Sequence, residues 1–101
     1  MDAFALPIET LVVTHEVLQS PTQLNSATNW IFDARTCTID KSFVIAYQNF
    51  LAVLTSEQHS RVLVVEAANL GEFPEECIAV PTLGEAKDLI EMERIERDLG
   101  F

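Results

Sequence analysis

The sequence is poor in the residues that build nucleotide and metal sites: it holds three glycines, two histidines and two cysteines among 101 residues. The glycines lie far apart, so no glycine-rich loop follows a strand and no backbone cradle for a nucleotide phosphate is expected. A zinc site built on His15 or His59, the only histidines, would need a cluster of cysteine or carboxylate partners around them. His59 follows the end of a predicted helix, where an imidazole can cap free carbonyls. We therefore expect no cofactor and no metal.

Long hydrophobic runs are also missing. No apolar run reaches the ~18 residues that span a bilayer, and the start, Met1-Asp2-Ala3-Phe4, lacks the basic residues of a signal peptide. These absences predict no membrane insertion and a cytoplasmic location. Cysteines stay reduced in that compartment, so Cys37 and Cys77 are expected to be free thiols.

Positive charge is scarce as well. Six basic residues stand against 16 acidic ones, which gives a formal net charge of -10. Such a surface repels phosphate backbones, so we predict that nucleic acid is not a partner. The length suits one domain, residues 1–101, with one modest core.

What the sequence does contain is a series of strand patterns. Residues 9–14 are rich in β-branched side chains, which favour a strand. Residues 29–34 and 61–67 hold continuous apolar runs, as expected for strands covered on both faces. A short fourth strand is predicted over 77–80, and residues 68–76 between the last two strands are predicted to form a loop.

Two amphipathic helices accompany these strands. The first, over 41–58, begins after the N-cap Asp40 and places Phe43, Tyr47, Phe50 and Leu54 on one stripe. The second, over 83–99, begins at a capping box of Thr82 and Glu85. Its inner stripe includes Ala86, Leu89 and Ile90, its helical spacing pairs Glu91 with Arg94 and Glu93 with Arg97, and Gly100 is expected to stop it.

Strand, helix and strand over 29–65 form a βαβ unit, for which a right-handed crossover between parallel neighbours is expected. The prediction is thus an α/β fold: a single sheet of about four mostly parallel strands with two main helices. Residues 20–29, with Ser20 as a candidate N-cap, are either a short helix or a loop.

The segment Asp33–Cys37 follows the C-terminal end of a strand, where α/β proteins place ligand sites. Arg35 could lower the pKa of the Cys37 thiol and make it a nucleophile. The alternative is a structural thiol beside a surface ion pair. The neighbouring carboxylates Glu75 and Glu76 are expected on an exposed loop. The question of an enzyme stays open, and the sequence leans against one.

One absence points to an interaction surface. No charged residue occurs between Lys41 and Glu57, although charged residues make up 22% of the chain. The outer face of this helix carries Ser42, Ile45, Asn49 and Ala52. An uncharged face of small residues suits close contact with a protein partner or with a second copy in a homodimer. The alternative is that residues 15–28 of the same chain cover it.

The order of these elements resembles the STAS domain, the anti-sigma-factor-antagonist fold, and related STAS/SEC14-like proteins. The resemblance covers about Asn29 to Glu91 and rests on two strings, Ile31-Phe32-Asp33 leading to Asp40-Lys41-Ser42-Phe43, and Val80-Pro81-Thr82-Leu83-Gly84-Glu85-Ala86. It implies a STAS/SpoIIAA-like fold with Ser42 in the place of the phosphorylatable serine. Lys41 and Phe43 differ from the serine and glycine of the family pattern.

Three functions follow as hypotheses. The preferred one is a non-enzymatic protein–protein interaction or regulatory module of STAS-like type, which uses the helix over 41–58 and the turn before it. The first alternative is a binder of a small apolar or lipid-like ligand in a core pocket lined by aromatic residues such as Trp30 and Phe32. The second alternative is a small enzyme that uses Cys37.

Overall fold

A computed structural model describes residues 7–20, 24, 28–54 and 59–100 of the chain. Its centre is a parallel sheet in which β1 (Ile8–Val12), β2 (Asn29–Asp33), β3 (Arg61–Val64) and β4 (Ala79–Val80) lie side by side in the order of the sequence. The predicted α/β fold with one four-stranded parallel sheet is therefore confirmed.

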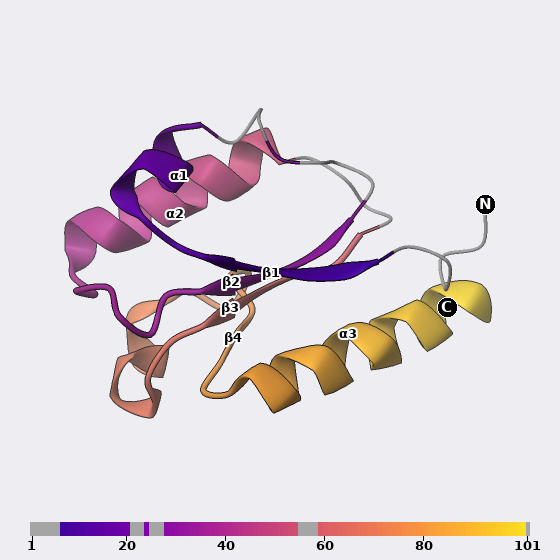
Figure 1. Cartoon of the computed structure of the whole chain (residues 1–101). Coiled ribbons are helices and arrows are strands. Elements are labelled where there is room, and N and C mark those ends of the chain that lie inside the picture. Colours follow the sequence, from indigo (N-terminus) through magenta and orange to yellow (C-terminus); the bar gives the residue numbers. More distant parts are fainter. Residues whose placement is uncertain (1–6, 21–23, 25–27, 55–58, 101) are drawn as a thin grey trace.

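Helices cover both faces of this sheet (Figure 1). On one face lie α1 (His15–Gln19) and α2 (Lys41–Val53), which contact each other. On the other face α3 (Leu83–Asp98) crosses β2, β3 and β4. A 3-10 helix, η3 (Ala67–Glu72), connects β3 to β4.

Successive residues of a strand point to opposite faces, so the continuous apolar runs fill two cores. Toward α2, Phe32 and Leu63 join Phe50 in a buried cluster. Toward α3, Ile31 and Val62 join Ile90. Covered faces on both sides explain why the two central strands show no polar alternation.

The core on the α2 side is aromatic. The ring centroid of Phe32 lies 5.1 Å from that of Phe50 and 6.2 Å from that of Tyr47, both in edge-to-face arrangement. Trp30 stacks on Phe32 at 6.0 Å. The five residues predicted to be buried in the sheet core are all buried, with Trp30 the most exposed of them at 9%: Trp30, Phe32, Phe50, Leu63 and Val65.

Both predicted helix caps are present. Asp40 Oδ1 accepts from the backbone N–H of Phe43 at 2.9 Å, and Thr82 Oγ1 accepts from that of Glu85 at 3.1 Å. Glu85 reaches back to the Thr82 hydroxyl, which donates to Glu85 Oε2 at 3.0 Å. Gly100, at φ 81, follows the end of α3 as predicted.

Some boundaries differ from the prediction. β1 ends at Val12 rather than at residue 14, because Thr14 caps α1 by accepting from the backbone N–H of Val17 at 3.2 Å. Ser20 is the C-cap of α1, because its N–H donates to the Val17 carbonyl at 3.1 Å. Most of the segment that Ser20 was predicted to cap, residues 21–23 and 25–27, lies outside the described residues. The predicted end of α2, residues 55–58, lies outside the described residues.

The connection between β3 and β4 also differs, because η3 replaces most of the predicted loop. Leu70 and Phe73 pack against the core on the α2 side and hold this short segment in a helical turn.

Candidate functional site

A hollow of about 430 Å³ opens at the C-terminal ends of β1 and β2, where α1 meets the first turn of α2. This is the edge of the sheet at which parallel α/β proteins bind ligands. Its lining includes residues of several chemistries: Thr14, His15, Leu18, Cys37, Asp40, Ser42 and Phe43. The hollow therefore brings Ser42 and Cys37, both singled out in the sequence, to one place.

Asp40 organises the first turn of α2. Its Oδ1 accepts from the Phe43 N–H and from the Ser42 hydroxyl, each at 2.9 Å. These hydrogen bonds, the one from the Phe43 N–H first, hold the pKa of the Asp40 carboxyl below its usual range. Ser42 is exposed, with its hydroxyl oriented by a carboxylate at a helix N-terminus. Its position leaves the hydroxyl accessible from solvent.

Arg35 is not available to activate the Cys37 thiol. Arg35 is bound by Asp33 instead, through Nε to Oδ1 at 2.9 Å and a terminal nitrogen to Oδ2 at 2.8 Å. The Cys37 thiol donates to the Val13 carbonyl at 3.4 Å. Burial first, and then the charge of Asp33, raises the pKa of Cys37. The geometry matches the other interpretation, a structural thiol beside a surface ion pair.

The outer face of α2 is open to solvent. All four residues predicted to form it are exposed: Ser42, Ile45, Asn49 and Ala52. Ile45 is 50% exposed, and Val53 at the end of the helix adds a second apolar side chain at 53%. Residues on the opposite side of the helix, Tyr47 and Phe50, are buried. Helix α1 contacts α2, but it leaves this face uncovered.

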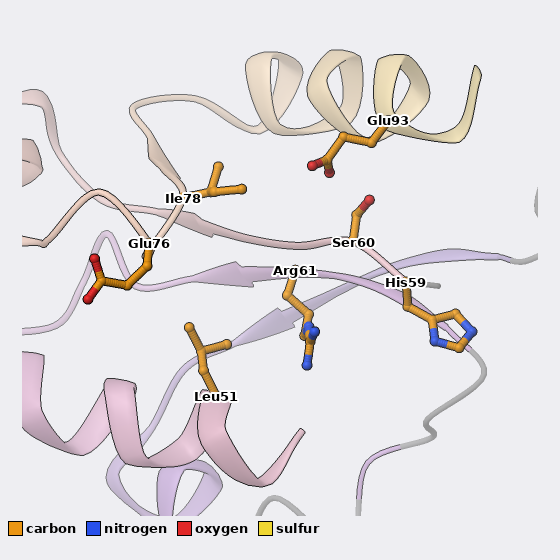
Figure 2. A pocket seen from close by; sticks show the side chains of 7 residues that line it. All are labelled: Leu51, His59, Ser60, Arg61, Glu76, Ile78 and Glu93. Carbon is orange, nitrogen blue, oxygen red and sulfur yellow. The ribbon is translucent and has the colours of Figure 1, made fainter. Parts of the chain in front are cut away.

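A second hollow, of about 260 Å³, lies where β3 extends beyond the short β4. In Figure 2, Ser60 points toward α3 and Arg61 points toward the side of Leu51 on α2. Glu93 from α3 and Glu76 line the same space. Burial, followed by the charges of Arg97 and Arg61, lowers the pKa of His59. The lining mixes carboxylates with basic groups, so it selects no single sign of ligand.

His59 lines this hollow just before β3, and its predicted role as a helix cap stays a prediction. Helix α2 ends at Val53, six positions before His59. Residues 55–58, which the prediction assigned to the end of this helix just before His59, lie outside the described residues.

Sequence reasoning missed a polar cluster at the N-terminal ends of the strands. Asn29, which is fully buried, accepts at Oδ1 from the Ser60 N–H at 2.8 Å. Arg97 of α3 donates to Ser60 Oγ at 3.2 Å and to Asn29 Oδ1 at 3.5 Å. Arg97 thus joins the sheet rather than the predicted partner Glu93. Only the polarity of Asn29 at the start of an apolar strand could have signalled this cluster.

Other candidate chemistry is sparse in the part of the chain that the structure describes. Glu75 and Glu76 are exposed, as predicted. Among the described residues, histidine, cysteine and carboxylate side chains form no group of three or more suited to a metal ion. No described helix combines the length and the apolar character needed to cross a bilayer.

Comparison with known proteins returns no match, whether to a protein-family model, to a curated protein or to a solved structure.

Proposed function

We propose that this protein is a non-enzymatic interaction module that binds a protein partner through the outer face of α2 and the turn before it. The observation that carries the proposal is the contrast between this face and the rest of the surface. The chain has a net charge of -10, yet the outer face of α2 is uncharged and exposes half of Ile45. Charge depletion around an exposed apolar side chain is typical of the centre of an interface.

The resemblance to STAS domains points to the same part of the molecule, the start of α2. In that reading Ser42 is a regulatory serine, and its exposure in the first turn of α2 supports this role. A phosphate on Ser42 would add up to two negative charges beside Asp40 and next to the uncharged face. Phosphorylation would therefore weaken binding of a partner that fits a neutral surface.

The geometry favours this proposal over the two alternatives. The aromatic side chains invoked for an apolar ligand pack on one another, as Phe32, Phe50 and Tyr47 do. The thiol invoked for an enzyme is engaged with a backbone carbonyl, and its pKa is raised. No observation on the outer face of α2 opposes a protein partner.

Site-specific photo-crosslinking tests the proposal. A photoreactive amino acid at Ile45 should yield a discrete adduct in cells, and the same residue at Met92, an equally exposed apolar position on α3, should not. The substitutions Asn49→Glu and Ala52→Glu should abolish the adduct, because each places a carboxylate in a contact that cannot hydrate it. Their thermal melts should match the parent protein, since glutamate is a good helix former.

Equal crosslinking from Ile45 and Met92, or adducts that survive both glutamates, would contradict the proposed interface. An adduct of twice the chain mass would identify a second copy as the occupant of this face.

A further inference from the structure

No strand of the described residues pairs with the outer edge of β1. At the two ends of the β1–β2 ladder, the Asn29 N–H donates to the Pro7 carbonyl at 2.9 Å and the Val13 N–H donates to the Asp33 carbonyl at 2.8 Å. Odd-numbered residues of β1 therefore face β2. Backbone groups of successive strand residues point to opposite sides, so Ile8, Thr10 and Val12 direct theirs away from the sheet.

Within the described chain, no strand lies beyond β1 and no hydrogen bond reaches these outward groups. The strand itself, Ile8–Val12, has no lysine, no proline and no bulge, and Glu9 is its only charged residue. Thr10 and Val12 are exposed on the face that α3 covers elsewhere, with Val12 57% exposed. An open, β-branched edge of this kind is a template for another strand.

We propose that this edge pairs with β1 of a second copy, antiparallel and about a two-fold axis at Thr10. That register places Thr10 opposite Thr10 and Ile8 opposite Val12. All of these are hydrogen-bonded pairs, so every outward N–H and carbonyl of the strand finds a partner. The side chains on one face then form a ladder of Ile, Thr and Val, and cross-strand pairs of β-branched residues stabilise a sheet. The strand is thus complementary to itself.

Electrostatics favours the same register. Glu9 is the only charged residue of β1, and the two-fold axis places it opposite Leu11 of the other copy. The two Glu9 carboxylates then lie on a diagonal about 7–8 Å apart rather than face to face. For a chain with a net charge of -10, the edge is one of the few places where two copies can approach. Salt should strengthen this dimer, because it screens the repulsion between the copies.

Sedimentation velocity tests the proposal on the full chain, from about 10 µM to about 1 mM. The parent protein should show a monomer–dimer equilibrium. Thr10→Pro removes an outward N–H and leaves the β1–β2 ladder intact, and should weaken the dimer at least about tenfold. Thr10→Asp places two carboxylates directly opposite each other and should do the same, whereas its neutral match Thr10→Asn should retain the dimer. Glu9→Gln should tighten it.

A parent protein that stays monomeric throughout this range would overturn the proposal, and so would dimers that survive both Thr10→Pro and Thr10→Asp. If Thr10→Pro fails to fold, the pair of Asp and Asn variants decides alone, because Thr10 is exposed in the monomer. A dimer that is lost on Asn49→Glu with Ala52→Glu but kept in Thr10→Asp would place self-association on α2 and would also overturn it.

Discussion

The two edges of the sheet end in different ways. β4 is only two residues long, and both η3 and α3 contact it. The carbonyls of Ile78 and Val80 accept hydrogen bonds from the β3 side. The residues whose backbone groups point away from β3 are therefore Ala79 and Pro81, and proline has no N–H to offer. β1 is five residues long. Three of its residues, Ile8, Thr10 and Val12, direct their backbone N–H and carbonyl groups outward, and none of them is a proline.

The comparison teaches where this molecule can make contacts. A short strand followed by proline and covered by helices closes one edge. Among the described residues, the opposite edge and the outer face of α2 remain open. Charge is sparse in both: Glu9 is the only charged residue of β1, and the outer face of α2 has none. These two charge-poor places are where the proposed contacts would meet the least electrostatic repulsion.

Truncating a core side chain that supports the central strands should destabilise the whole sheet, both edges included. Phe50 is 1% exposed and packs on Phe32 of the central sheet at 5.1 Å between ring centroids. Phe50→Ala should cost about 3–5 kcal/mol, a large part of the ~5–15 kcal/mol that stabilises a typical domain. Chemical denaturation followed by Trp30 fluorescence measures this. A midpoint close to that of the parent protein would show that α2 does not hold the sheet.

A lysine on each edge strand should sharpen the comparison. Val80 is half-buried against the α3 core, so Val80→Lys should destabilise the fold by roughly 1–3 kcal/mol. Val12 is 57% exposed, and Val12→Lys should stay within about 0.5 kcal/mol of the parent protein. Thermal melts at low protein concentration give both values without a contribution from dimers. Equal losses at the two positions would contradict the described difference between the edges.

Loosening α3 should affect the β4 side first. Thr82 caps α3 directly after β4, and Thr82→Ala should cost roughly 1 kcal/mol. Thr82→Ser keeps the capping hydroxyl and serves as the control. Urea denaturation measures the loss. A loss shared by the serine variant would assign the effect to the methyl group of threonine rather than to its capping hydroxyl.

Acid should act first on the β1 side. Asp40 and Asp33, whose pKa values are lowered by hydrogen bonds to Phe43 and to Arg35, lie next to β1 and β2. A lowered pKa in the folded state stabilises it above the unfolded value of about 3.9, and this contribution is lost as the pH falls through the folded pKa. Melting temperatures should therefore decline below about pH 4. Asp40→Asn keeps an N-cap that does not titrate and should show a smaller decline.

Local patterns predicted most of the fold, because the relevant contacts are close in sequence. The caps at Asp40 and Thr82 lie within three residues of the groups they bind, and the apolar run of β3 reflects burial on both faces. Helix α1 escaped prediction because five residues carry little periodicity. Arg97 was assigned to a helical neighbour, but it contacts Ser60 and Asn29, which are 37 and 68 positions away. Spacing within a helix cannot reveal such a contact.

The candidate site likewise combines features that a local sequence pattern shows with features that depend on distant contacts. The absence of charge on the outer face of α2 could be seen in the sequence, because it runs along a single helix. Whether residues 15–28 cover that face was left open. The surroundings of Cys37 depend on the ion pair between Asp33 and Arg35 and on the carbonyl of Val13, which follows β1 and lies 24 positions away in the sequence. The open edge of β1 depends on strand order, which no short pattern determines.

Amide hydrogen exchange followed by NMR tests the central claim, that charge-poor patches of this acidic domain serve for contact, most directly at β1. In dilute samples the amides of Ile8, Thr10 and Val12 should exchange fast, while those of Glu9 and Leu11 are protected by β2. At high concentration the outward amides should gain protection, and the amides of β4 should not change. Exchange at the outward amides that is independent of concentration would contradict the account.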